Sequence, residues 1–213
     1  MTLEALEKVA QAEQLAILGA LHTEPADGLG DGTIALLGPS EPGFWPHVQD
    51  APEFKDGAPD PMDRWSRRTI TTMAEVAGGL PLFPFGSPAR PFIGWALRSG
   101  QAFVSPASLL VHAEAGLLVS YRGAVLFQDR LDLPPTANNP CDSCAAKPCL
   151  SACPPRALTK AGYNLAACHQ FLDAPEGHAC MSQGCAVRRS CPLSRKYPRM
   201  PEQSAFHMKA FHS

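Results

Sequence analysis

Apolar side chains recur with near-helical spacing in three stretches of the first hundred residues. The first stretch, residues 3–21, follows Thr2, whose hydroxyl is of the kind that caps a helix N-terminus. The second, residues 62–78, ends at Gly78, a residue type common just after the last helical turn. The third, residues 90–100, is short and also ends at a glycine. We therefore expect three helices in this part of the chain.

Shorter apolar runs predict strands between and after these helices. TIALLG at residues 33–38 is flanked by turn residues and is typical of a buried strand. LPLFPFG at residues 80–86 contains two prolines, which favours an edge strand because proline has no N–H to donate. Residues 108–128 alternate as two or three strands, whereas the six prolines of residues 38–61 predict loops. The pattern predicts an α+β domain with an antiparallel component.

Composition and charge exclude several classes of protein. The chain of 213 residues is 45% hydrophobic and 18% charged, which allows it to bury a core. A net charge of −2 argues against nucleic acid as a main partner. No run approaches the roughly 18 apolar residues of a membrane-spanning helix. The N-terminus lacks the basic and apolar regions of a signal peptide. We expect a cytoplasmic protein without a membrane partner.

The cysteines divide the chain into two parts. All eight lie between residues 141 and 191, and the segment before them, LDLPPTANNP at residues 131–140, has the proline and asparagine content of a linker. We therefore expect an N-terminal domain over residues 1–135 and a C-terminal domain over residues 136–213. The last 33 residues carry six Arg and Lys against one Glu, and such cations would offset an anionic cofactor.

The cysteine spacing can be explained by three chemistries. The pattern is Cys141-x2-Cys144-x4-Cys149-x3-Cys153-Pro, then Cys168, then Cys180-x4-Cys185-x5-Cys191-Pro. Disulfides are disfavoured because a chain of this size with a cysteine-free core does not need them. Eight thiolates could fill two zinc sites, but a run of four cysteines closed by Cys-Pro does not form the usual two knuckles. Iron–sulfur ligation fits best, since two-cluster ferredoxins use a similar run with a narrower gap.

In such ferredoxin runs the fourth cysteine ligates the other cluster. Three cysteines on a tight loop can surround one cubane, while the fourth, at the start of a short helix, points away from it. The second group of cysteines mirrors the first, because each ends in Cys-Pro. We therefore assign one [4Fe–4S] cluster to Cys141, Cys144, Cys149 and Cys191, and a second to Cys153, Cys168, Cys180 and Cys185.

This order of cysteines resembles the iron–sulfur domain of epoxyqueuosine reductase and, more distantly, that of reductive dehalogenases. In those proteins the clusters feed a cobalamin held by the preceding domain. DRWSRRTITTMAEVAG at residues 63–78 is similar to part of the corresponding epoxyqueuosine reductase domain, and residues 109–135 also resemble cobalamin-processing (cblC-type) proteins. The resemblance implies a nitroreductase-like α+β domain, followed by a small ferredoxin-like domain, and it makes cobalamin a candidate cofactor.

Four residues outside the cysteine region are candidates for a site. Asp63 matches the aspartate that acts as proton donor in epoxyqueuosine reductase, although a helix N-terminal acid stabilised by the helix dipole is the alternative. His112 lies between apolar neighbours, where it could contact a cofactor or be a hydrogen-bonded core histidine. Tyr121 and Arg122 end an expected strand, where they could line the same pocket, or Arg122 could simply pair with a carboxylate.

Two functions of different classes follow. The first is a reductase whose two clusters deliver electrons to a substrate or cofactor, such as a corrinoid, in the N-terminal pocket, since a domain of about 135 residues exceeds what a carrier needs. The second is a ferredoxin-type electron carrier whose N-terminal domain is only a docking surface. Both require a redox partner protein as electron donor. Purely structural clusters are disfavoured because a crossed pair of clusters suits electron transfer.

Overall fold

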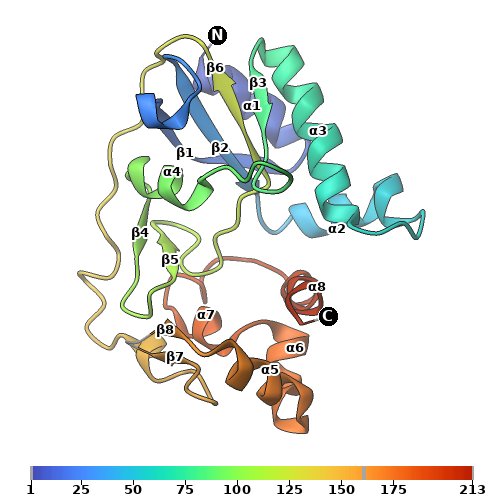
Figure 1. The fold of residues 1–213 in the computed structure, drawn as a ribbon, viewed down its shortest axis with the longest axis vertical. Coiled ribbons are helices and arrows are strands. Elements are labelled where there is room, and N and C mark those ends of the chain that lie inside the picture. The colour runs from blue at the N-terminus through green and yellow to red at the C-terminus, as the bar shows by residue number, and fades with distance from the viewer. Residues whose placement is uncertain (1, 160–161, 213) are drawn as a thin grey trace. The chain divides into compact units, whose positions relative to one another are not determined.

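The computed structural model describes residues 2–159 and 162–212 (Figure 1). The chain divides into two compact units. The N-terminal unit comprises Met1–Ala102 and Ser120–Ala137, and the C-terminal unit comprises Phe103–Val119 and Asn138–Ser213. The chain passes from the N-terminal to the C-terminal unit for the last time after Ala137, close to the expected boundary at residue 135. Residues 103–119, which we expected in the first domain, instead belong to the C-terminal unit.

The N-terminal unit is built on a four-stranded antiparallel sheet. Its strand order is β1 (Leu15–His22), β2 (Thr33–Pro39), β6 (Gly123–Phe127) and β3 (Leu80–Leu82). The two central strands are buried along their whole length, as expected for continuous apolar runs. β3 lies at the edge of the sheet, as its proline content predicted. The α+β class expected from the sequence is confirmed.

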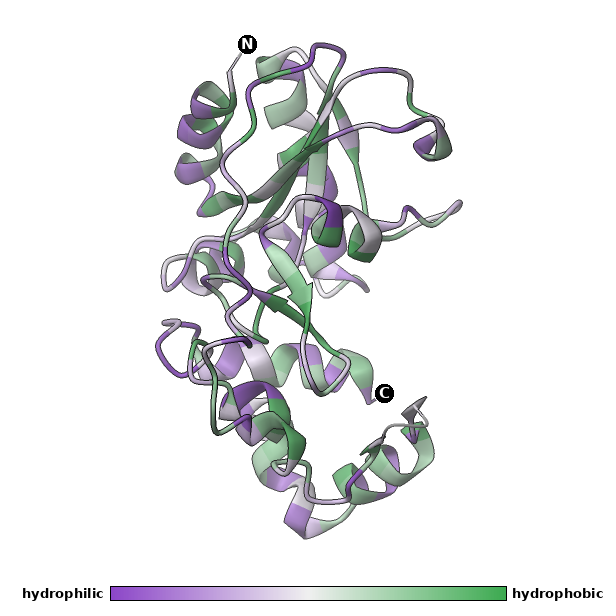
Figure 2. Cartoon of the chain, turned by 90° about the vertical axis from the view of Figure 1, so that its left-hand side faces the viewer, coloured by the Kyte–Doolittle hydropathy of each residue, from purple (hydrophilic) through white to green (hydrophobic). Residues whose placement is uncertain are grey.

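Two long helices, α1 (Leu3–Ala12) and α3 (Pro61–Ala77), pack against this sheet and against each other. α1, next to the label N in Figure 2, turns its hydrophilic residues outward, while Leu6 and Ala10 are fully buried. The expected helices over residues 62–78 and 90–100 correspond to α3 and to α4 (Phe92–Arg98). The segment expected to be loops also forms α2 (Phe44–Asp50) and the short 3-10 helix η2 (Pro52–Phe54), while η1 (Pro25–Asp27) precedes β2.

The single helix expected over residues 3–21 is wrong. The helix ends at Ala12, and the following residues form β1. Gln14 at φ 54° and Gly19 at φ 146° lie outside the helical region of backbone space. A Cβ at Gly19 would lie 2.6 Å from the hydroxyl of Ser99, so this position requires glycine. The apolar spacing of residues 15–22 suits a helix as well as a strand, and pairing with β2 makes this segment a strand.

The C-terminal unit consists of short elements. Two-stranded sheets are formed by β4 (Ala102–Val104) with β5 (Leu110–His112), and by β7 (Leu158–Thr159) with β8 (Gly162–Tyr163). β5 and β6 are the only strands that form in residues 108–128, where two or three were expected. The remaining elements are listed in chain order: η3 (Pro148–Leu150), α5 (Leu165–Asp173), η4 (Pro175–Gly177), α6 (His178–Gln183), α7 (Ala186–Ser190) and α8 (Pro201–Phe211).

The core of the C-terminal unit joins residues from distant parts of the chain. Val111 and Leu117, from the segment 103–119, pack with Cys149 and Val187. Four further cysteines are partly buried against this cluster: Cys141, Cys153, Cys185 and Cys191. This shared packing explains why residues 103–119 belong to the C-terminal unit. Within the described part of the chain, no helix has the length and apolar character needed to cross a membrane.

Candidate metal centres

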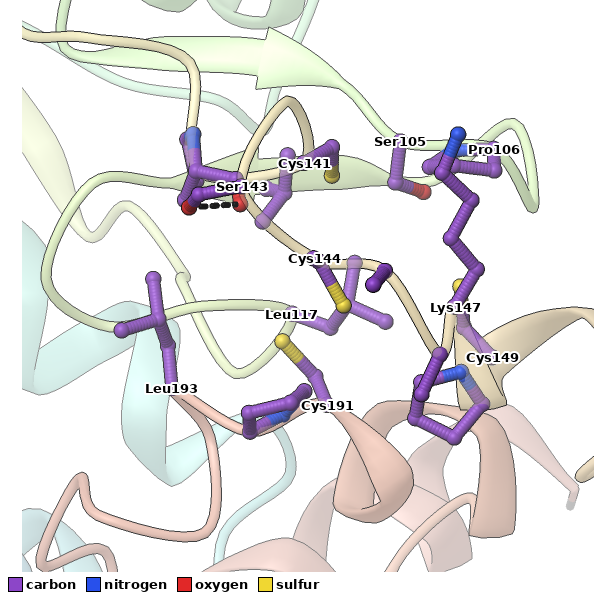
Figure 3. Close-up of a pocket in the computed structure, with 16 residues that line it drawn as sticks. Ser105, Pro106, Leu117, Cys141, Ser143, Cys144, Lys147, Cys149, Cys191 and Leu193 are labelled. Atoms are coloured by element: carbon purple, nitrogen blue, oxygen red, sulfur yellow. Dashed lines mark hydrogen bonds between the residues drawn. The ribbon is translucent and has the colours of Figure 1, made fainter.

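Four cysteines line one cavity of about 330 Å³ in the C-terminal unit (Figure 3). We call them set 1: Cys141, Cys144, Cys149 and Cys191. The thiols of Cys144 and Cys191 point toward one another in Figure 3. The remaining wall is mostly apolar, and includes Val111, Leu117 and Leu193. The structure thus brings Cys191 to the three cysteines that precede it by more than forty residues.

Local backbone structure positions the first three thiols of set 1. The N–H of Cys141 donates to Oδ1 of Asn139 at 3.0 Å, and the N–H of Cys144 donates to the carbonyl of Cys141 at 3.4 Å, which makes a tight turn. Lys147 then adopts the left-handed conformation, at φ 40°, and begins η3. Because η3 carries Cys149, the residues that widen the gap in the motif form the entry to this short helix.

The other four cysteines, set 2, lie near one another in the same unit: Cys153, Cys168, Cys180 and Cys185. Burial raises the pKa of the Cys168 thiol, and the neighbouring Cys185, Cys153 and Cys180 raise it further when ionised. Sγ of Cys153 accepts the N–H of Ala157 at 3.3 Å. The structure therefore places the four cysteines of set 1 around one cavity, and three of the cysteines of set 2 near the fourth, Cys168.

Helix α7 connects the two sets. Cys185, from set 2, is its N-cap, and Cys191, from set 1, is its C-cap. A helix advances about 1.5 Å per residue, so these two positions are roughly 9 Å apart along the axis. α7 also packs on η3, which lies just before Cys153 in the chain. Two groups bound at the two sets would consequently lie close together.

Two thiols of set 1, those of Cys141 and Cys149, resist ionisation unless a cation is present. Burial raises the pKa of Cys141, and the ionised thiols of Cys149, Cys191 and Cys144 would raise it further. Burial likewise raises the pKa of Cys149. A metal ligand must be a thiolate, so binding of a positively charged metal group would offset this repulsion and release protons.

The thiols of set 1 are spread around a cavity. Among the described residues, no three Cys, His, Asp or Glu side chains converge closely enough to hold one metal ion. Zinc needs sulfur atoms about 2.3 Å from a common centre. The thiols of set 1 instead surround a cavity, which suits a multinuclear group that each thiol binds through a different iron. The eight cysteines all have free thiols in the structure.

A partly buried cation lies beside set 2. Arg188 donates from Nη1 to the carbonyl of Leu117 at 2.6 Å, and burial lowers the pKa of its guanidinium group. No carboxylate in the described ranges forms an ion pair with Arg188. The groups that would stabilise its charge are Cys185 and Tyr163 in their ionised forms. An anionic group held by set 2 would provide the missing negative charge.

In the N-terminal unit, Asp63 and Arg122 influence each other electrostatically. Burial raises the pKa of the Asp63 carboxyl, and the guanidinium of Arg122 partly opposes this effect. Burial also raises the pKa of Tyr121. The hydroxyl of Tyr121 and Nε of Arg122 are buried, and neither has a hydrogen-bond partner among the described residues. Asp63, Tyr121 and Arg122, three of the four candidates named from the sequence, therefore lie in the N-terminal unit. The Tyr121 hydroxyl and Nε of Arg122 could each form a hydrogen bond to a ligand.

His112 lies in the other unit, and its contacts indicate a structural role. Its side chain is buried in β5, and Nδ1 accepts the backbone N–H groups of Glu114 and Ala115 at 3.1 and 3.3 Å. These bonds hold the turn that joins His112 to Gly116 through a pair of backbone hydrogen bonds. The geometry supports the hydrogen-bonded core histidine that the sequence left open.

Comparisons with protein-family models, with curated proteins and with solved structures found no match for this chain. The site therefore rests on its own residues. Sequence reasoning did not single out Tyr163, whose side chain lies near the Cys168 thiol. It noted Arg188 only as part of a basic tail. The sequence could have pointed to Arg188, because it follows Cys185 by three residues, and residues three apart on a helix share a face.

Proposed function

We propose that this chain is an iron–sulfur redox protein that binds one [4Fe–4S] cluster at set 1 and another at set 2. The observation that supports this most directly is the division of eight thiols into two groups of four. Set 1 combines a cysteine run with Cys191 from much later in the chain, and set 2 takes the last cysteine of that run. Neither group leaves a thiol over, and ligation by four cysteines is the usual requirement of a [4Fe–4S] cluster.

Each cluster would supply one-electron transfer, and the chain supplies the surroundings that this requires. The apolar wall of set 1 limits access of water, and Arg188 places positive charge beside set 2. The C-terminal unit as a whole carries nine Lys and Arg residues against five Asp and Glu, which favours anionic occupants. The ends of α7 lie close enough in space to favour electron exchange between the sets.

We further propose that electrons pass to a substrate or cofactor, a corrinoid included, held by the N-terminal unit. Tyr121 and Arg122 offer buried polar groups to such a ligand. Asp63 would donate a proton, because a raised pKa increases the protonated fraction of the carboxyl near neutral pH. This role agrees with a nitroreductase-like fold for the N-terminal unit, a ferredoxin-like fold for the cysteine module, and a cytoplasmic location with a protein electron donor.

A ferredoxin-type carrier is the second candidate. All eight cysteines and the segment that supports them form one compact unit. Such a module holds every ligand that two clusters need, and the N-terminal unit would then serve only to dock a partner.

Metal analysis of the anaerobically purified full chain tests the cluster proposal. We expect about eight irons and eight sulfides per chain. One or two zinc ions per chain with negligible sulfide would overturn it. Cys168→Ser and Cys144→Ser should each lower iron by up to half, and the two variants should lose different spectroscopic components. Loss of the same component in both would contradict the two ligand sets.

Ligand titration separates the two candidates. Cob(II)alamin and, separately, flavin are added to the iron-loaded protein while the visible spectrum is recorded. A saturable spectral change that Arg122→Ala weakens at least several-fold would support the reductase. Two intact clusters with no response to either compound would instead favour the carrier. Asp63→Asn serves as the control, since removal of a proton donor should leave ligand binding largely intact.

A further inference from the structure

The arginines of the N-terminal unit differ in whether their side chains have a partner. Four of them form hydrogen bonds with other side chains: Arg64, Arg68, Arg98 and Arg130. Within the described residues, the side chains of Arg67, Arg90 and Arg122 form neither a hydrogen bond nor an ion pair. A guanidinium group without a partner keeps its donors for a ligand.

Two of these three arginines, Arg67 and Arg122, lie at the same end of the sheet. Arg122 immediately precedes β6, and its Nε is buried without a hydrogen-bond partner among the described residues. β3 runs antiparallel to β6, so the start of β6 meets the end of β3. A Cβ at Gly123 would lie 3.3 Å from Cδ1 of Phe83, the residue that follows β3. The same ring lies under Arg67.

Two aromatic rings hold Arg67 at this end. Phe83 and Phe85 are stacked, with centroids 5.2 Å apart and planes inclined by 27°. The guanidinium carbon of Arg67 lies over both rings, 5.0 and 5.2 Å from their centroids. Attraction to the rings positions the cation but supplies no oxygen acceptor, so its N–H groups remain available. Because Arg67 is exposed, a ligand can reach these groups from solvent.

The carboxyl of Asp63 lies within electrostatic range of both arginines but bonds to neither. Asp63 precedes Arg67 by four residues on α3, and within the described residues it forms no hydrogen bond or ion pair. Burial raises the pKa of this carboxyl, while Arg122 and Arg67 oppose the rise. When protonated, the carboxyl could itself donate to an anion between the two arginines.

We propose that this end of the N-terminal sheet is an oxyanion site, in which Arg67 and Arg122 bind a phosphate or carboxylate group of the ligand. Guanidinium groups match the geometry of both groups and can bind them through two parallel hydrogen bonds. The two arginines come from different elements, α3 and the start of β6, so they can contact one anion from different directions. This site deepens the proposed function and rests on it for a ligand in the N-terminal unit, to which it assigns a negatively charged group.

Isothermal titration calorimetry of the full chain tests this site, with pyrophosphate and succinate as separate probes in buffer of low ionic strength. Saturable heat with at least one probe is expected. Pyrophosphate alone would indicate a phosphate-bearing ligand, and succinate alone a carboxylate-bearing one. Arg67→Gln and Arg122→Gln should each weaken the binding at least several-fold. Arg67 is exposed, so Arg67→Gln keeps the test valid if Arg122→Gln fails to fold.

Arg130→Gln is the matched control. It removes the same charge beyond the other end of β6, where Arg130 bonds to Nδ1 of His22 at 2.8 Å, and it should bind the probe as wild type does. No saturable heat with either probe, or equal weakening by Arg67→Gln and Arg130→Gln, would overturn the oxyanion site. Iron analysis of the same preparations separates this result from the cluster proposal. Full iron without anion binding contradicts the oxyanion site alone, whereas anion binding without iron and sulfide contradicts the clusters alone.

Discussion

At the scale of single residues, the N-terminal unit places the carboxylates of Glu53 and Asp27 inside the fold and pairs each of these two with an arginine. The carboxylate of Glu53, a residue only 8% exposed, accepts hydrogen bonds from Nε and Nη2 of Arg68 at 2.5 and 3.0 Å. Asp27 accepts Nε1 of Trp95 at 2.8 Å and Nη1 of Arg98 at 2.9 Å. Since a buried carboxylate without a partner is strongly unfavourable, these pairs link η2 to α3 and η1 to α4.

Glu53→Gln should lower the free energy of unfolding by about 1–3 kcal/mol at pH 7. The hydrogen bond from Arg68 lowers the pKa of Glu53 below its ordinary value of 4.5. Its contribution is therefore fully present above that value and is lost as the pH falls through the lower folded-state pKa. Urea unfolding at several pH values should show wild type and variant converging in acid. Asp50→Asn, which breaks an exposed pair with Lys55, should change little at any pH.

At the scale of elements, α7 connects the two cysteine sets, because one cysteine of each set flanks it. Its five residues separate Cys185 from Cys191, and the side chain of Val187 is completely buried between them. The orientation of each thiol relative to the other depends on the number of helical residues. A change in this number would therefore affect both sets, whereas the loss of one cysteine affects its own set directly.

Insertion of one alanine after Val187 should reduce iron and sulfide below the content of either Cys168→Ser or Cys144→Ser. An added residue rotates everything beyond it by about 100° around the helix axis, so Cys185 and Cys191 cannot both keep their directions. Iron and sulfide analysis of the anaerobically purified variant measures the effect. The same insertion after Gly28, in an exposed turn of the N-terminal unit, should leave the iron content unchanged. Equal losses from the two insertions would contradict this role of α7.

The sequence predicts elements well where local pattern and long-range pairing agree. α3 follows from its apolar spacing and from Gly78, and the edge position of β3 follows from its prolines. Residues 15–22 were expected to be helical because their spacing suits either structure, and only pairing with β2 decides between them. The grouping of cysteines followed from ligand spacing. The position of Tyr163 near Cys168 did not, because it depends on a hairpin turn and on stacking against a helix nearly fifty residues later.

At the scale of the whole molecule, the two units differ in what fills their interiors. The N-terminal unit has a cysteine-free core with fully buried side chains such as Trp65, Ile34 and Leu36. The C-terminal unit has helices of at most eleven residues, and several of its core positions are cysteines. Its stability should therefore depend on the occupant of the two sets, as in other small domains that fold around a metal.

Removal of iron should loosen the C-terminal unit selectively. In hydrogen exchange followed by mass spectrometry, we expect amides of residues 141–191 to lose most of their protection in the iron-free protein. Amides of β2 and β6 should keep theirs, because their sheet contains no cysteine. Uniform loss of protection in both units, or no loss in either, would contradict this dependence.

The segment 103–119 makes the C-terminal unit discontinuous, and this limits how such a module can be transferred between proteins. The carbonyls of Leu117 and Leu118 accept hydrogen bonds from the guanidinium groups of Arg188 and Arg199, respectively. The N–H of Leu117 donates to the hydroxyl of Ser194. A gene fusion that carried only residues 138–213 would contain every cysteine but none of these supports. A fragment that kept these supports would have to begin at Phe103, and it would then also carry β6 of the N-terminal sheet.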